Sequence, residues 1–131
     1  MQSFLAVGAG AAAGAWLRWG LGIALNPVFP TIPMGTLAAN LVGGFLMGVS
    51  MAILGHFEAL SPVWRLLVMT GFLGGLTTFS TFSAETTSLL SHGQFNWAAA
   101  IVAAHVAGSV LMTFAGIAST DLALRAFGEV L

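Results

Sequence analysis

The 131-residue sequence contains no cysteine and very few charged residues. Without cysteine the chain has no disulfide framework, no thiolate metal site and no cysteine nucleophile. Lys and Arg together number three, all of them arginine, which excludes a polybasic patch for nucleic acid or for anionic lipid head groups. Charged residues make up 5% of the chain and hydrophobic residues 58%, whereas a soluble domain carries roughly 25% charged residues. This composition predicts an integral membrane protein without a separate soluble domain.

Four apolar segments are separated by turn signals, and we predict that each crosses the bilayer as a helix. The predicted spans are residues 3–25, 34–55, 62–91 and 97–127, within a single transmembrane domain of residues 1–131. Asn26-Pro27, with two further prolines, separates the first two spans, Glu58 lies at the exit of the second, and Ser61-Pro62 begins the third. The predicted fold class is therefore an all-α membrane protein with both termini on one side.

Residues 74–83 (GGLTTFSTFS) combine two glycines with five hydroxyls inside an apolar segment. Both features weaken a helix, so we predict a break in the third helix near residues 74–78. Non-helical backbone at membrane depth is tolerated only where protein buries it or where it lines a wet cavity, so the break indicates an ion or solute site. Phe79 and Phe82 project from nearly the same helix face, and the electropositive edge of an aromatic ring can approach an anion. The alternative is that both are lipid-facing or core side chains.

Polar side chains recur at helical spacing in two of the other spans. Thr36 and Asn40 share a face of the second span, where the Asn40 amide must bond to a neighbouring helix or to a solute. His105, Ser109 and Thr113 repeat every four residues along the fourth. Together they favour a donor-rich, weakly charged path that suits a dehydrated anion. The alternative is hydrogen bonding between helices without any solute.

The remaining ionisable residues do not form a catalytic set. Arg18 lies late in the first span, where its side chain can reach the interface and anchor the helix or attract anions to a vestibule. Glu85 and His92 are interpreted as solvated helix ends. No nucleophile–base arrangement or metal-ligand cluster emerges from the spacing, so we predict that the protein is not an enzyme.

The arginines are almost balanced between the two sides of the membrane. Arg65 and Arg125 lie toward the side of the termini and Arg18 toward the other, an asymmetry too weak to fix the direction of insertion. A chain that inserts both ways could pair antiparallel with itself; the alternative is one topology set by other features. Small residues four apart predict a tight bundle that buries part of its surface in an oligomer, at Gly10 and Gly14, Gly44 and Gly48, and Gly71 and Gly75.

Three motifs, at residues 14–19 (GAWLRW), 35–40 (GTLAAN) and 74–83, resemble the CrcB/Fluc family of fluoride channels, and the resemblance extends over essentially the full length. It implies a dual-topology antiparallel homodimer with two fluoride pores, each built from both subunits. By this resemblance Phe79 and Phe82 turn their ring edges to fluoride, Asn40 is the pore amide, and His105 stands where some members carry a tyrosine. The polar track would comprise Thr36, Ser80, Ser83, Ser109 and Thr113. Backbone carbonyls of Gly74 and Thr77 would hold a central, structural Na⁺.

The function that this resemblance implies is passive export of fluoride across a bacterial inner membrane. The partners are then fluoride, a second copy of the chain and the lipid bilayer, and no nucleic acid. Two alternatives come from other classes. A small dual-topology multidrug or cation transporter would need a midmembrane carboxylate, which the first two spans lack. A structural subunit that transports nothing would leave the hydroxyls around the break without a purpose.

Overall fold

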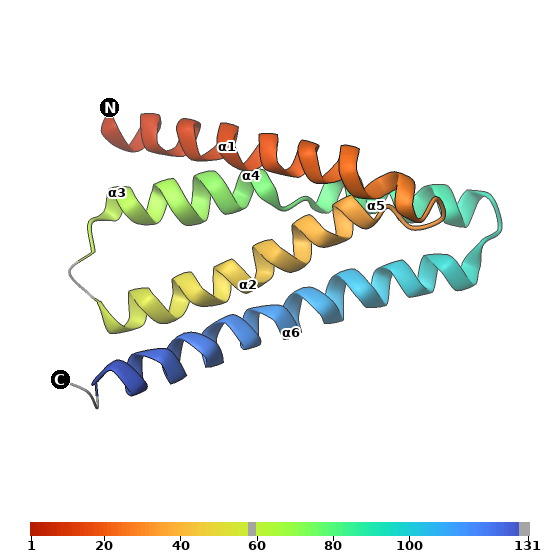
Figure 1. Cartoon of the computed structure of the whole chain (residues 1–131). Coiled ribbons are helices and arrows are strands. Elements are labelled where there is room, and N and C mark those ends of the chain that lie inside the picture. Colours follow the sequence, from red (N-terminus) through yellow and green to blue (C-terminus); the bar gives the residue numbers. More distant parts are fainter. Residues whose placement is uncertain (58–59, 129–131) are drawn as a thin grey trace.

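The computed structural model describes residues 1–57 and 60–128, which are entirely helical apart from short connections (Figure 1). Glu58 lies outside the described residues. The first half contains α1 (Gln2–Leu25), the short 3₁₀ turn η1 (Asn26–Val28) and α2 (Met34–His56). The second half contains α3 (Pro62–Arg65), the π-helical stretch η2 (Leu66–Leu73), α4 (Gly74–Leu76), α5 (Phe79–Ser91) and α6 (Phe95–Gly128).

Among the described residues, three helical segments are long and apolar enough to cross a membrane, namely Met34–His56, Pro62–Ser91 and Phe95–Gly128. α1 is not among them, because its hydropathy is lowered by Arg18 and by many small residues. Its 24 residues are nevertheless about 36 Å long at 1.5 Å per residue, which exceeds the roughly 30 Å of a hydrocarbon core. The chain runs back and forth along one long axis, and both described ends lie at the same end of the structure (Figure 1).

Local side-chain bonds shape the connections between these helices. The Asn26 side-chain oxygen accepts a hydrogen bond from the Gly35 N–H at 2.8 Å, which ties the first connection to the start of α2. Ser61 caps α3 by accepting from the Val63 N–H at 3.3 Å, with Pro62 in the first turn. Gly93 adopts a φ of 71° between α5 and α6, a conformation that other residues rarely adopt. The first connection is therefore held by a side-chain bond to α2, and the last one turns at a glycine.

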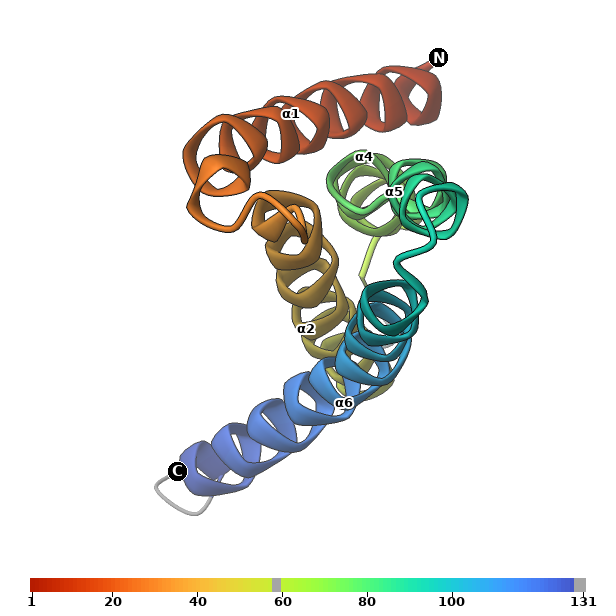
Figure 2. The same cartoon turned by 90° about the vertical axis from the view of Figure 1, so that its right-hand side faces the viewer.

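Helix backbones approach closely where the small residues were predicted to pack. A Cβ on Gly14 of α1 would overlap the Phe72 carbonyl oxygen of η2, and one on Gly48 of α2 would overlap the Thr113 carbonyl oxygen of α6. α1 accordingly packs on η2 and α4, and α2 packs on α6, as the end-on view also shows (Figure 2). The π-helical hydrogen bonding of η2 was not predicted from the sequence; it lies where η2 meets α1.

The helical path of the third segment is interrupted at Thr77 and Thr78. Thr77 has φ −82° and ψ 154°, and Thr78 has φ −149° and ψ 124°, so both are extended. The Thr78 hydroxyl oxygen then caps α5 by accepting from the Thr81 N–H at 3.1 Å. Extended residues here leave backbone groups that need partners from elsewhere in the chain.

Candidate functional site

Asn40 of α2 provides the partners for the interrupted backbone. Its Oδ1 accepts from the Thr78 N–H at 2.7 Å, and its Nδ2 donates to the Thr78 carbonyl at 2.9 Å. The same amide nitrogen lies 2.9 Å from His105 Nδ1 on α6. Asn40 therefore joins three helical segments at one point, and its polar atoms are all engaged within the chain.

A groove of about 420 Å³ lies beside this junction. Six of the predicted pore residues line it together with Thr77 and Thr78, which brings side chains from three parts of the chain to one surface. The six are Asn40, Phe79, Phe82, His105, Ser109 and Thr113.

The two phenylalanines form an edge-to-face pair in this groove. Their ring centroids are 5.5 Å apart at an interplanar angle of 66°. Phe82 is only 7% exposed and also stacks on the His105 ring, with centroids 4.7 Å apart. Phe79 is 77% exposed. One ring is thus enclosed by its own chain and the other projects from it, so a single copy surrounds only part of this site.

A second cavity, of about 520 Å³, lies on the other side of the interruption. It is lined by Arg18 of α1 and by the hydroxyl residues Thr36, Thr78 and Thr81. Thr78 also lines the groove, so the extended segment is a shared wall of the two spaces. The guanidinium charge of Arg18 favours a small anion in this cavity, whereas the Thr36 and Thr78 hydroxyls donate to Glu85 and Thr81.

Thr36, Ser80 and Ser83 do not line the groove. The Thr36 hydroxyl belongs to the Arg18 cavity and donates to Glu85 Oε1 at 2.5 Å. Ser80 is exposed, and its hydroxyl lies 3.3 Å from that of Thr78; Ser83 is half-buried. The predicted polar track is therefore divided in a single chain. Its members Ser109 and Thr113 lie in the groove beside Asn40, and its other three members lie apart from the groove.

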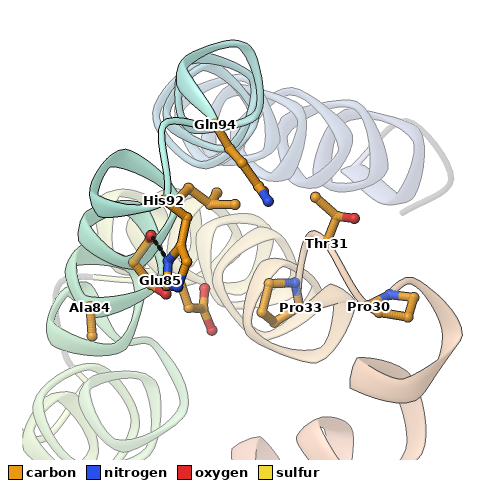
Figure 3. Close-up of a pocket in the computed structure, with 9 residues that line it drawn as sticks. Pro30, Thr31, Pro33, Ala84, Glu85, His92 and Gln94 are labelled. Atoms are coloured by element: carbon orange, nitrogen blue, oxygen red, sulfur yellow. Dashed lines mark hydrogen bonds between the residues drawn. The ribbon is translucent and has the colours of Figure 1, made fainter.

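Glu85 is not the solvated helix end that the sequence suggested. It is half-buried, accepts the Thr36 hydrogen bond, and its Oε2 is buried without a hydrogen-bond partner in the described part of the chain. It also lines a third cavity, of about 590 Å³, between α5 and the first connection. Figure 3 shows Glu85 with His92 on one side and Pro33 on the other. Sequence spacing could not reveal this site, because Thr36 and Glu85 are 49 residues apart.

The two carbonyls predicted to hold Na⁺ differ in their surroundings. In a continuous helix the Gly74 carbonyl would accept from the Thr78 N–H, but that N–H is directed to Asn40. The Gly74 oxygen is a hard ligand without its helical donor, which fits a cation site. The Thr77 carbonyl instead accepts from Arg18 Nη1 at 3.4 Å, and a guanidinium beside a cation is unfavourable. Gly74 therefore fits the role as it stands, whereas Thr77 fits it only if Arg18 moves away.

Comparison with known proteins gives one family model and relatives that share a single description. Residues 5–117 match the family model described as CrcB-like protein, Camphor Resistance (CrcB). A protein of Pseudomonas putida (strain W619), described as fluoride-specific ion channel FluC, is 57% identical over 119 residues, which cover 91% of this chain and 94% of that protein. Proteins with the same description from Aromatoleum aromaticum and Chromobacterium violaceum are each 62% identical. These two matches cover 91% and 90% of this chain, and 91% and 94% of the respective relatives.

Proposed function

This chain belongs to the CrcB family of multi-pass membrane proteins, and from that premise we propose that it conducts fluoride across a bacterial inner membrane. The relatives named above are described as ion channels and not as enzymes. The proposed direction is passive export. Hydrogen fluoride enters as a neutral acid and ionises in the cytoplasm, and a membrane potential that is negative inside favours outward movement of the anion.

The observation that carries this proposal is the groove beside the interrupted helix. It combines aromatic rings, whose edges are electropositive, with hydroxyl, amide and imidazole groups, and none of the acidic side chains within residues 1–57 and 60–128 lines it. Fluoride is small and a strong hydrogen-bond acceptor, so donors at close range can compensate its dehydration better than that of chloride. The Arg18 cavity, which shares Thr78 with the groove, is the proposed vestibule that attracts the anion.

Purified protein in liposomes loaded with potassium fluoride tests the function. With valinomycin present to release potassium, we expect rapid efflux of fluoride, measured with a fluoride electrode, and far slower efflux of chloride from matched vesicles. Empty liposomes are the control. Equal rates for the two halides would contradict a fluoride-selective channel, and flux that requires a cation or proton gradient would favour the small-transporter alternative.

We further propose that the working unit is an antiparallel homodimer with two pores. The support is the incomplete enclosure of the site. Phe79 is exposed and the groove is open, and among the described residues a Cβ on Gly74 would meet only the Met69 carbonyl oxygen, at 3.9 Å. A second copy would cover this side and complete each pore. In a homodimer with two-fold symmetry every site off the axis occurs twice, so a pore at each groove gives two equivalent pores.

Antiparallel pairing requires the chain to insert in both orientations, which the near balance of Arg18 against Arg65 and Arg125 favours. We expect reporter fusions at the C-terminus to give signals from both sides of the membrane. Lysines added to the uncharged first connection, residues 26–33, should bias insertion so that this connection lies in the cytoplasm. A single location for the unmodified chain would contradict the antiparallel dimer.

A central Na⁺ is proposed from the Gly74 carbonyl, whose helical donor is directed to Asn40, and from the copy of this carbonyl across the two-fold axis. The Thr77 carbonyls would complete four oxygen ligands once Arg18 moves away. The ion would be structural and would not be transported. It would stabilise the unwound backbone and offset the charge of anions in the flanking pores.

Exchange of sodium for a large organic cation during purification tests this ion. We expect the dimer to lose thermal stability and fluoride flux to fall, and both to recover when sodium is restored. Arg18→Leu removes the competing donor at the Thr77 carbonyl, so this variant should need less sodium for the same stability. If thorough removal of sodium changes neither stability nor flux, the carbonyls have another partner.

A further inference from the structure

The His105 side chain has one nitrogen whose role is not explained by packing. His105 is 4% exposed, and Phe82 stacks on its ring. Its Nδ1 faces Asn40, but its Nε2 is buried and has no hydrogen-bond partner among the residues that the structure describes. A buried polar atom left without a partner is costly, so such an atom beside a candidate ion path calls for a ligand.

The hydrogen bonds around Asn40 determine where the His105 proton lies. A backbone N–H can only donate, so the bond from Thr78 N to Asn40 fixes the amide oxygen on that side. The amide nitrogen then faces the Thr78 carbonyl and His105 Nδ1, and it also can only donate. His105 Nδ1 must therefore accept. The imidazole is neutral, and its proton is on Nε2.

Several other donors near the interruption are already used within the chain. Both Asn40 N–H groups are engaged, and the Thr36 hydroxyl donates to Glu85. The Thr113 hydroxyl lies 3.0 Å from the Gly44 carbonyl and 2.9 Å from the Ser109 carbonyl, so its proton is directed to the backbone. The His105 Nε2–H is in contrast a buried donor with no acceptor in the described part of the chain, on a residue that lines the groove.

We propose that His105 is a neutral donor locked in one tautomer, which presents Nε2–H to the permeating fluoride while Nδ1 holds Asn40 against the Thr78 backbone. This inference rests on the proposed function, and it names the atom and protonation state that act. A neutral buried N–H offers no net charge, so it favours a strong hydrogen-bond acceptor over a larger, weaker one such as chloride. A doubly protonated imidazole could not accept from Asn40, so the charged form would release this contact.

Two substitutions separate the roles of the two ring nitrogens. His105→Asn places an amide oxygen near the position of Nδ1, which keeps an acceptor for Asn40 but removes the Nε2 donor. His105→Gln places an amide nitrogen near the position of Nε2, which keeps the donor but removes the Nδ1 acceptor.

We expect His105→Asn to retain dimer stability and to lose fluoride flux by about tenfold or more, which is the effect of losing one hydrogen bond to a charged group. His105→Gln should conduct better than His105→Asn and melt at a lower temperature. His92→Asn, at an exposed turn, is the control and should match the unmodified protein.

Nitrogen NMR of protein labelled with ¹⁵N-histidine gives a readout that packing alone would not produce. The chain has three histidines, and the His105 signals are assigned by their loss in His105→Gln. We expect a protonated Nε2 and an unprotonated Nδ1, and a shift of the Nε2 signal when fluoride is added. A proton on Nδ1, a charged imidazole, an Nε2 signal that ignores fluoride, or full flux in His105→Asn would each overturn the inference. Absence of fluoride flux from the unmodified protein would instead refute the proposed function.

Discussion

Replacing either groove phenylalanine by isoleucine is expected to abolish fluoride flux. Isoleucine is apolar and fills part of the same space, but it has no electropositive ring edge to face an anion. Phe79 and Phe82 form one edge-to-face pair, so each substitution also removes the orientation that the partner ring depends on. We expect Phe79→Ile and Phe82→Ile to reduce efflux from liposomes to below about one tenth, which corresponds to roughly 1.4 kcal/mol in the barrier.

The control for this experiment is Phe4→Ile, because Phe4 is an exposed phenylalanine of α1 and does not line the groove. Its flux should remain unchanged. Size-exclusion chromatography of all three variants shows whether the dimer persists. Undiminished flux in both groove variants would refute the role of the rings, whereas loss of the dimer would indicate that the rings act through packing.

Gly14→Ala is expected to disrupt the packing of α1 on the rest of the chain. The added methyl group would overlap the Phe72 carbonyl oxygen and would lie 2.7 Å from the Leu76 amide nitrogen, and neither backbone atom can move without moving its helix. Forcing one methyl group into a packed interface costs about 1–3 kcal/mol, and more where backbone must shift. Because Leu76 directly precedes the interruption, we also expect the Thr77–Thr78 segment to be displaced and flux to be lost.

Gly8→Ala is the matched control, since it lies in the same helix and a Cβ there would meet nothing within 4 Å. Alanine also has the higher helix propensity, so this variant should be at least as stable as the unmodified protein. Thermal unfolding in detergent, followed by size-exclusion chromatography, compares the two. Equal stability of Gly8→Ala and Gly14→Ala would show that α1 does not pack on η2 as closely as described.

Asn40 illustrates how far sequence reasoning reaches at the site. A buried amide must have partners, so the sequence predicted either a neighbouring helix or a solute. The structure identifies the partners as the Thr78 backbone and His105, which lie 38 and 65 residues further along the chain. An isolated pattern contains no information on which distant group satisfies a polar atom. The assignment of the His105 tautomer depends entirely on that pairing.

Glu85 shows the opposite case, in which the sequence interpretation was wrong. Glu85 lies six residues before the turn Ser91-His92-Gly93, which is the pattern of an acid near a solvated helix end. The Thr36 hydroxyl and the first connection cover it instead. The burial of Glu85 depends on how α2 crosses α5. The periodicity of residues along one helix contains no information on that crossing.

The properties that the sequence determined by itself are those that depend on composition and on local chemistry. A chain with 5% charged residues cannot hydrate its surface, prolines and glycines mark the connections, and paired glycines with threonines weaken a helix in its interior. Tertiary structure alone decided which polar groups meet: Asn40 bonds to Thr78, and Arg18 reaches the Thr77 carbonyl. It also decided that Thr36 lies apart from the groove, and that Phe79 is exposed while Phe82 is buried. The physical reason is that these facts depend on distances between residues far apart in the chain, which are set by the close approach of glycine backbones at the helix crossings.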